Sequence, residues 1–387
     1  MKGYVFISNS SKPTKEENNS RKAIRLTNVS KPCLKIALSM GYNVWLGVNR
    51  NNPQELECSL PVKKYDSHTY RSLFNLKDNM IAFKNLMSLL KNNQIEVIHC
   101  NTPIGGIMGR VCGKIMGVKK IIYTAHGFHF YKGAPLINRT IFKWAEMIMA
   151  HWTDAILTMN KEDYENAQNF KLKNNGKVYY IPGIGIDTEN YKNIQIDKEI
   201  LREKLGIDKT NIICISMGDL VLRKNYKIAI EAISKTNNKN IHYLICGKGP
   251  EEENLKKLCK MLNVEEQVHF LGFRSDVKEL LQISDIFLFT TLQEGMPRSM
   301  MEAMASGLPC VSSKIRGNVD LIENGKGGFL EEANDSEGFA KKISLLANDS
   351  ELRKKMKDYN LERIEKFDIK IVERKLEKIY KEVLGDS

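Results

Sequence analysis

The sequence lacks any apolar run long enough to cross a membrane as a helix. A spanning helix needs about 20 consecutive apolar residues, and the candidate segment 145–159 is broken by His151, Thr153 and Asp154. The first eight residues have too short an apolar core for a secretory leader, so they are expected to form a first strand. The sequence therefore predicts neither a transmembrane segment nor a signal peptide.

Several ligand-binding motifs are absent as well. The eight cysteines include no C-x-x-C pair and no Cys/His spacing typical of zinc sites, which favours a protein of the reducing cytosol. No Asp-x-Asp pair and no G-x-x-x-x-G-K-[ST] loop occur, and Gly247 and Gly249 lack a third glycine at the dinucleotide spacing. A zinc module, a disulfide scaffold, a P-loop enzyme and an NAD-binding enzyme are all disfavoured.

Positive charge is concentrated in the N-terminal half. Residues 1–190 contain 26 of the 59 Lys and Arg residues but only 14 of the 46 Asp and Glu residues, so they carry +12 of the net charge of +13. Such an asymmetry is typical of a surface that faces a membrane, a phosphorylated substrate or nucleic acid. A basic surface that only keeps the protein soluble has the same composition. Charge alone therefore leaves the partner open.

Short apolar runs alternate with helical patterns in both halves of the chain. The strand-like runs 96–100 and 120–124 flank a glycine-rich helix at 104–116, and strand 212–216 followed by helix 226–235 begins a second series. Alternating strands and helices imply a parallel sheet covered on both faces. We expect an α/β protein with two Rossmann-like domains.

The segment Ile181–Asp187 interrupts this alternation with one proline and two glycines, and it is predicted to be the hinge. We expect one domain at 1–186, a second at 187–365, and a C-terminal helix at 366–387 that returns to the first. Ligands of such proteins bind at the carboxyl ends of the strands, so the site is expected in a cleft between the domains.

The segment 290–309, TTLQEGMPRSMMEAMASGLP, carries the strongest chemical signal. Gly295 permits a tight turn after a strand, and Pro297 suits the first turn of a helix. Free amides at a helix start bind anions such as a diphosphate. Glu294 before the helix and Glu302 within it can both accept hydrogen bonds from hydroxyl groups. Without further context, the segment also fits a helix with a Met/Ala packing face.

This segment resembles the E-x₇-E signature of the retaining glycosyltransferases of family 4, which have the GT-B fold. Other segments resemble further motifs of that family, in the family's order. They are the His-Gly loop at 124–128, the hinge at 181–187, the diphosphate loop at 217–224, the G-x-G-P turn at 245–250 and the F-L-G-F-R-x-D run at 270–276. Residues 125–135 are similar to the capsule and exopolysaccharide branch of the family.

The resemblance implies an N-terminal acceptor-binding domain and a C-terminal nucleotide-sugar-binding domain. It implies retaining transfer of a hexosyl or N-acetylhexosaminyl group from a UDP-sugar, with GDP as the other possible nucleotide. The acceptor would be lipid-linked or a glycan in bacterial-type surface polysaccharide synthesis. With no Asp-x-Asp pair, cationic side chains and helix amides are expected to replace a metal, so we expect no metal and no cofactor.

The resemblance also assigns roles to individual residues. The catalytic residues implied are His126, Lys224 and Glu294. The donor-binding residues implied are Arg223, Lys224, Gly247, Arg274, Glu294, Gly295, Met296, Pro297, Arg298, Ser299 and Glu302. Weaker acceptor-side candidates are His129, Lys132 and Arg139.

The sequence departs from the family pattern at two places. Asp219 stands where the phosphate loop usually has an arginine. An acid beside a diphosphate is repulsive, so Asp219 is expected to point away while Lys224 and Arg223 hold the phosphates. The first loop lacks the family's frequent glycine pair and carries the polar stretch 8–28 instead, so it carries no assigned acceptor contact.

Two other functions fit parts of the sequence. A nucleotide-sugar 2-epimerase has a similar two-domain fold and needs no acceptor, but the order of the motifs argues against it. A nucleic-acid-binding protein would use the basic N-terminal half, yet no aromatic or helical reading elements are organised among those charges. Both remain alternatives to glycosyl transfer.

The basic half is also the expected acceptor-binding half, which suggests peripheral contact with the inner face of the cytoplasmic membrane. Anionic lipid attracts basic segments by about 1 kcal/mol per Lys or Arg near the surface. The candidate contacts are Lys12, Lys15, Arg21, Lys22, Arg25, Lys119, Lys120, Lys132, Arg139 and Lys143. We therefore expect a cytoplasmic protein that binds this membrane reversibly.

Overall fold

The computed structural model describes residues 2–14, 23–24, 26–50, 52–72, 74–192 and 194–385. The chain forms two compact units. Unit 1 consists of Met1–Ile184 together with Ile371–Ser387, and unit 2 consists of Gly185–Lys370. Of the basic candidates for membrane contact, Lys15, Arg21, Lys22 and Arg25 lie outside the described residues.

Unit 1 is built on a parallel sheet of seven strands in the order β3-β2-β1-β4-β5-β6-β7. The central strands are rich in apolar residues and largely buried, as expected for a parallel sheet covered on both faces. The strands are β1 (Gly3–Ile7), β2 (Asn43–Val48), β3 (Lys63–Asp66), β4 (Ile95–Asn101), β5 (Lys120–Ala125), β6 (Ala155–Thr158) and β7 (Lys177–Tyr180).

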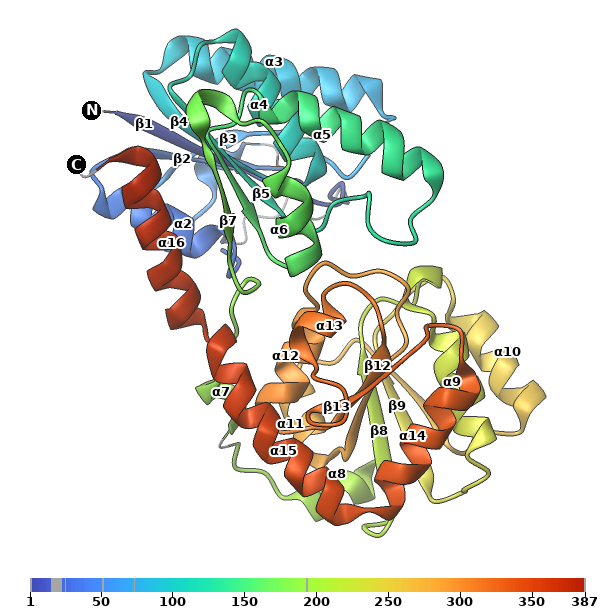
Figure 1. Cartoon of the computed structure of the whole chain (residues 1–387). Coiled ribbons are helices and arrows are strands. Elements are labelled where there is room, and N and C mark those ends of the chain that lie inside the picture. The colour runs from blue at the N-terminus through green and yellow to red at the C-terminus, as the bar shows by residue number, and fades with distance from the viewer. Residues whose placement is uncertain are drawn as a thin grey trace. The chain divides into compact units, whose positions relative to one another are not determined.

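Helices cover both faces of this sheet. Val5 and Ile7 of β1 belong to a core shared with four of the helices, and Figure 1 shows three of these, α3, α4 and α5, gathered along one side. The four helices are α3 (Leu76–Asn92), α4 (Pro103–Ile115), α5 (Lys143–Ala150), which the π-helical turn η2 (Asn138–Phe142) precedes, and α6 (Lys161–Gln168). The alternate residues Tyr4 and Phe6 face α2 (Ser30–Ser39) and α16 (Ile369–Leu384).

Unit 2 repeats the design with six parallel strands in the order β10-β9-β8-β11-β12-β13. The order reverses between β8 and β11, and ligands of such sheets bind outside the carboxyl ends of the strands at this point. The strands are β8 (Ile212–Met217), β9 (Ile241–Cys246), β10 (Val268–Gly272), β11 (Ile286–Phe289), β12 (Cys310–Ser313) and β13 (Gly328–Glu331).

A hydrophobic core of unit 2 lies on the sheet face that carries Cys214 and Tyr243, mainly under three helices. These are α9 (Tyr226–Lys235), α10 (Glu252–Leu262) and α14 (Ser336–Asn348). The other helices of the unit are α7 (Glu189–Lys192), α8 (Lys198–Lys204), α11 (Val277–Ile283), α12 (Arg298–Ala305), α13 (Asn318–Leu321) and α15 (Ser350–Ile364). The buried methionines Met300, Met301 and Met304 show that α12 does have the packing face its sequence suggested.

The predicted fold class is confirmed, since both units are parallel α/β sheets with helices on both faces. Among the elements of unit 1 that did not stand out in the sequence are a strand and a helix whose composition explains why. Strand β3 reads KKYD and buries only Tyr65, because it is an edge strand with a polar, exposed side. Helix α5 is short, and it carries exposed apolar side chains on its outer side as well as buried ones on its inner side.

In the part of the chain that the structure describes, no helix combines the length and the apolar character needed to cross a bilayer.

The last helix is fastened to unit 1 by a buried hydrogen-bond network. Tyr380 of α16 lies 2.7 Å from the hydroxyl of Tyr4 and 2.5 Å from Nδ1 of His99. His99 Nε2 lies 2.7 Å from the Oγ1 of Thr124. Burial lowers the pKa of His99 from its usual 6.5 to about 3, so the ring is neutral and its two nitrogens have distinct roles as acceptor and donor.

We predict that this network makes unit 1 sensitive to acid. Because the folded pKa of His99 lies below the unfolded value, the unfolded state takes up more protons as the pH falls below about 6.5, and stability is lost. The share of His99 in the loss of unfolding free energy from pH 7 to pH 5 is expected to be about 2 kcal/mol. A His99→Gln variant should lack this share, so its stability should fall less steeply with pH than that of the wild type. Chemical unfolding can be followed by tryptophan fluorescence, because Trp45, Trp144 and Trp152 all lie in unit 1. If the unfolding free energy of the wild type and of His99→Gln changes equally with pH, the acid sensitivity does not come from His99.

Candidate functional site

The candidate donor site of unit 2 lies in the loops that follow β8, β11 and β12. The loop after β8 contains the short 3₁₀ turn Leu222–Lys224, and the loop after β11 runs from Thr290 to Pro297. The two loops are joined by backbone, since the amide of Leu292 donates to the carbonyl oxygen of Arg223 over 2.9 Å. Residues far apart in the sequence therefore meet at one end of the sheet.

A cluster of charges lies where these two loops meet. Nζ of Lys224 is 2.6 Å from Oε1 of Glu294, and the guanidinium of Arg223 is 3.1 Å from the same oxygen. The hydroxyl of Thr291 donates to it as well, over 3.3 Å. Two cations and one carboxylate leave the cluster with a net positive charge, which is suited to a second anion.

Lys224 is held in place on several sides. Its side chain is only 12% exposed, and Nζ lies 4.9 Å from the centre of the Phe289 ring, within the range of a cation–π contact. Gly218 has a φ of +148° and passes close to the aliphatic end of the lysine. A buried ammonium needs a counterion, so Glu294 stabilises Lys224 when no ligand is bound.

Helix α12 begins directly after this cluster. Pro297 is its N-cap residue and Arg298 its first helical residue, so the proline lies one position earlier than the first helical turn in which it was expected. A buried arginine from the loop after β12 holds the loop before α12 in place, because Nε of Arg316 donates to the carbonyl oxygen of Glu294 over 3.1 Å. Gly317 allows this approach, since a Cβ there would lie 2.3 Å from the carbonyl oxygen of Gly295.

The second acid of the pair, Glu302, lies on α12 and has its own partners. The hydroxyl of Tyr191 donates to its Oε1 over 2.9 Å, and Nε of Arg298 donates to the same atom over 2.9 Å. Burial, and then the neighbouring carboxylate, raise the pKa of Tyr191, so this hydroxyl remains a donor at neutral pH. Tyr191 is a residue that sequence reasoning missed, because nothing in its local sequence marks it.

Glu294 and Glu302 share one feature. Within the described residues, every side-chain contact of each carboxylate ends on Oε1. An ionised carboxylate has two acceptor oxygens. Each acid therefore keeps Oε2 for a ligand hydroxyl while its other oxygen fixes the side chain.

The remaining predicted donor residues fall into two groups. Gly295, Met296 and Ser299 lie half-buried in the loop and first turn around Pro297, next to the charge cluster. Gly247 serves packing, since a Cβ there would lie 1.9 Å from the carbonyl oxygen of Gly218 and its own amide donates to Gly272.

Two further loop residues were singled out from the sequence. The guanidinium of Arg274 is paired with Asp276, with Nε 2.7 Å from Oδ1. Asp219 is exposed, and its expected orientation away from a bound diphosphate stays a prediction.

In unit 1, His126 follows β5. Its Nε2 lies 2.7 Å from the Oδ1 of Asn101, at the end of β4. Desolvation lowers the pKa of His126 to about 4, so the ring is neutral at pH 7. Because an amide oxygen only accepts, Nε2 carries the proton and Nδ1 is left as an acceptor. Asn101 is buried, and its Nδ2 has no hydrogen-bond partner among the described residues.

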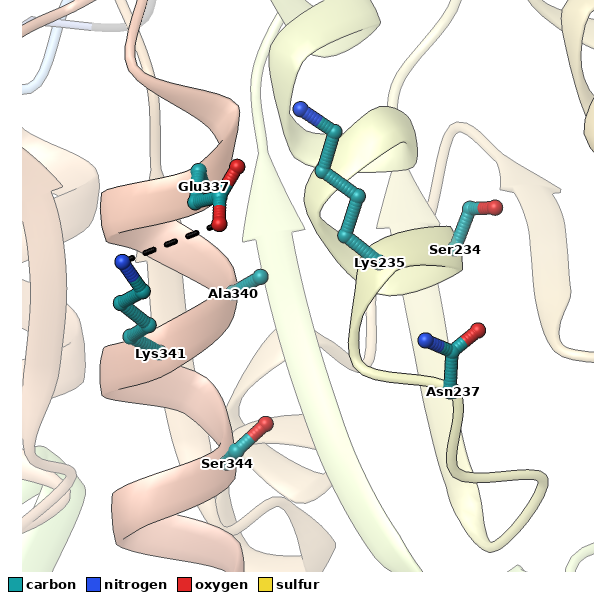
Figure 2. Close-up of a pocket in the computed structure, with 7 residues that line it drawn as sticks. All are labelled: Ser234, Lys235, Asn237, Glu337, Ala340, Lys341 and Ser344. Carbon is teal, nitrogen blue, oxygen red and sulfur yellow. Dashed lines mark ion pairs between the residues drawn. The ribbon is translucent and has the colours of Figure 1, made fainter.

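Two pockets lie outside these loops. One, of about 500 Å³, is in unit 1 and is lined by Asn9, Arg71, Ser72, Phe74, Thr102, Pro103, Ile104 and His129. Its position at the start of α4 places the acceptor-side candidate His129 beside polar groups. The other, of about 630 Å³, lies between α9 and α14 of unit 2. Figure 2 shows that its ion pair, Glu337 with Lys341, runs along α14, and none of its residues belongs to the predicted site.

Comparison with known proteins decides the family. The profile of the family described as "Glycosyl transferases group 1" matches residues 197–363, and that of "Glycosyl transferase 4-like" matches residues 17–172. The Bacillus subtilis protein EpsD, whose name places it among the glycosyltransferases, is 31% identical over 84% of this chain and 85% of its own length. The chain belongs to this glycosyltransferase family.

Other relatives of this glycosyltransferase carry more specific names. The UDP-Gal:alpha-D-GlcNAc-diphosphoundecaprenol alpha-1,3-galactosyltransferase of Escherichia coli is 31% identical over 73% of this chain and 74% of its own. Among solved structures, Anabaena HepE in complex with UDP and glucose matches with a TM-score of 0.75. The two sequences are 19% identical, and the match covers 99% of this chain and 100% of the HepE chain. At that identity the match supports the GT-B fold.

We predict that Glu294→Gln and Glu302→Gln each lower kcat/KM for the donor by tenfold or more. A hydrogen bond to a charged group contributes about 1.5–3 kcal/mol, and either amide would lose that charge. Neither acid belongs to the apolar core, and glutamine keeps the size of the side chain and one acceptor oxygen, so the variants should fold.

The matched control is Glu323→Gln, since Glu323 is an ion-paired acid of unit 2 outside these loops. If either site variant keeps the wild-type kcat/KM, the role of that acid is wrong.

Proposed function

We propose that the protein transfers a sugar from a nucleoside-diphosphate sugar, most simply a UDP-sugar, to a lipid-linked or glycan acceptor, with retention of the anomeric configuration. The acceptor assignment follows the relatives, two of which are named for diphosphoundecaprenol-linked sugars. The UDP assignment follows the HepE complexes with UDP and UDP-glucose. Both come to this chain as parts of the proposal.

One observation carries the proposal. The loops of unit 2 place a net positive cluster, the free amides of a helix start and two carboxylates with one available oxygen each at one end of the sheet. A nucleoside-diphosphate sugar needs cationic and amide donors for its phosphates and acceptors for its ribose and sugar hydroxyls. In the proposed arrangement, Lys224, Arg223 and the first amides of α12 bind the diphosphate.

Catalysis in this proposal rests on stabilising the leaving diphosphate. Negative charge grows on that group as the bond to the sugar breaks, and fixed cations and amides stabilise it without rearranging. Glu294 accepts a hydrogen bond from a sugar hydroxyl through Oε2, and Glu302 accepts one from a ribose hydroxyl. The neutral His126 of unit 1 would accept a hydrogen bond from a hydroxyl group of the reacting sugar through Nδ1. The acceptor hydroxyl attacks from the side that the diphosphate leaves, and the leaving phosphate takes its proton.

We also propose that the protein works at the inner face of the cytoplasmic membrane without crossing it. Part of the basic excess of unit 1 is already neutralised, since Lys12 pairs with Asp78 at 2.9 Å and Lys119 with Glu96 at 2.8 Å. Within the described residues, Lys120, Arg139 and Lys143 have no acidic partner, so they remain available to anionic lipid.

The direct test of the function is a transfer assay with a panel of UDP- and GDP-sugars and a diphosphoundecaprenol-linked sugar acceptor. The proposal expects nucleotide release that depends on the acceptor, and a product whose linkage keeps the donor's anomeric configuration by NMR. Turnover of a nucleotide sugar without acceptor would support an epimerase instead, and an inverted linkage would contradict retention.

We predict that Lys224→Ala raises the donor KM at least tenfold, because one charge-assisted phosphate contact contributes about 1.5–3 kcal/mol. Lys227→Ala is the control, since Lys227 is an exposed cation on the neighbouring helix.

Wild-type transfer is expected to persist in EDTA. Complete loss of transfer in EDTA, with recovery in Mg²⁺ or Mn²⁺, would contradict metal-independent transfer.

Membrane contact predicts a difference between lipid types. Co-sedimentation should be stronger with vesicles that contain anionic lipid than with neutral vesicles, and this difference should shrink with salt because screening acts over about 8 Å at physiological ionic strength. Equal partition to both vesicle types would remove the electrostatic contribution and leave the transferase assignment intact.

A further inference from the structure

Exposed apolar side chains are concentrated on one short segment of unit 1. Of the nineteen large apolar side chains that are exposed in the described part of the chain, six fall between residues 136 and 148. They are Leu136 (74%), Ile137 (60%), Ile141 (59%), Trp144 (70%), Met147 (39%) and Ile148 (51%). Single exposed apolar residues are ordinary, but a cluster of this density marks an interaction surface.

The cluster has helical geometry. Residues 137, 141, 144 and 148 are spaced by four, three and four, which puts them on one side of the continuous helical segment formed by η2 and α5. The opposite side faces the core, where Phe142 packs and Met149 and Ala150 are buried. The segment is therefore apolar towards the outside as well as towards the sheet. We call Ile137, Ile141, Trp144 and Ile148 the outer apolar face.

Basic residues outnumber acidic residues in and around this segment. Between residues 132 and 151 the sequence contains three basic residues and one acid, Glu146. Glu146 is turned inward, where its carboxylate binds the fully buried guanidinium of Arg110 at 2.6 Å. Arg139 and Lys143 lie on the helical segment itself. An apolar surface bordered by cations complements an anionic lipid surface, which offers phosphates at the level of its headgroups and hydrocarbon below them.

We propose that the outer apolar face of η2–α5 inserts into the headgroup region of a bilayer containing anionic lipid, with Arg139 and Lys143 against lipid phosphates and Trp144 at the interface. Tryptophan suits that depth because its ring is apolar and its N–H is polar. This inference rests on the proposed peripheral membrane contact and deepens it, since it names the inserting surface and adds an apolar contribution to an electrostatic one.

The inference makes a prediction that electrostatic attraction alone does not. Salt screens the charges but does not weaken apolar burial, so part of the wild-type binding to vesicles with 30% anionic lipid should persist at 1 M NaCl. The double variant I141Q/W144Q should bind these vesicles at least tenfold more weakly than wild type at physiological salt. Its residual binding should disappear in high salt.

The control is the double variant I200Q/M261Q, which removes two exposed apolar side chains from helices of unit 2. It should bind vesicles as wild type does. A second readout uses lipid with brominated chains, which quenches nearby tryptophans. Quenching should occur in wild type and be lost in Trp144→Leu, which keeps the apolar character of the face while removing the reporter.

Three results would overturn the inference. The first is vesicle binding by I141Q/W144Q that is as strong as that of the wild type. The second is complete loss of vesicle binding by the wild type in high salt. The third is a stable wild-type dimer that the double variant disrupts, which would assign the face to a second copy of the chain. Failure of the transferase proposal is measured separately. Transfer to a water-soluble acceptor without a lipid tail should be the same for wild type and I141Q/W144Q, and absence of transfer by wild type would reject the function without bearing on membrane insertion.

Discussion

The ion pair between Lys224 and Glu294 is the interaction on which the candidate donor site depends. Lys224 is largely withdrawn from water, and such a cation is stable only beside an anion. In the free protein that anion is Glu294, which shares its Oε1 between Lys224 and Arg223. The cluster keeps an excess of positive charge and a free carboxylate oxygen. It can therefore accept a diphosphate and a sugar hydroxyl without first breaking its own contacts.

The parallel sheet is what brings these residues together. Lys224 and Glu294 are 70 positions apart, yet both lie in loops at the carboxyl ends of adjacent strands, β8 and β11. Close backbone approach then fixes the loops, as Gly247 does beside Gly218 and Gly317 does beside Gly295. Because these fixed positions come from main chain and buried side chains such as Arg316, the site needs little reorganisation when a ligand arrives, which is the condition for effective stabilisation of a leaving group.

Local sequence was sufficient for the fold class and the elements next to the site. The period of apolar residues placed α9 at 226–235 as the structure has it, and the E-x₇-E segment placed Glu294 before a helix and Glu302 within it. It could not supply Tyr191, Arg316 or Asn101, whose importance comes only from distant partners. It also passed over α5, because the residues that make its outer face unusual, such as Trp144, are the ones that a core helix would have. The burial of Glu146 against Arg110 becomes visible only in three dimensions.

The central claim is that unit 2 separates recognition of the diphosphate from recognition of the sugar, with Lys224 acting on the first and Glu294 on the second. Calorimetric titration of full-length wild type and Glu294→Gln with UDP, and with the UDP-sugar that supports transfer, tests this directly. The account predicts that Glu294→Gln binds UDP as tightly as wild type or more tightly, because an acid is removed beside the phosphates. It predicts that the variant loses at least tenfold in affinity for the UDP-sugar. Equal weakening towards both ligands, or none towards either, would contradict it.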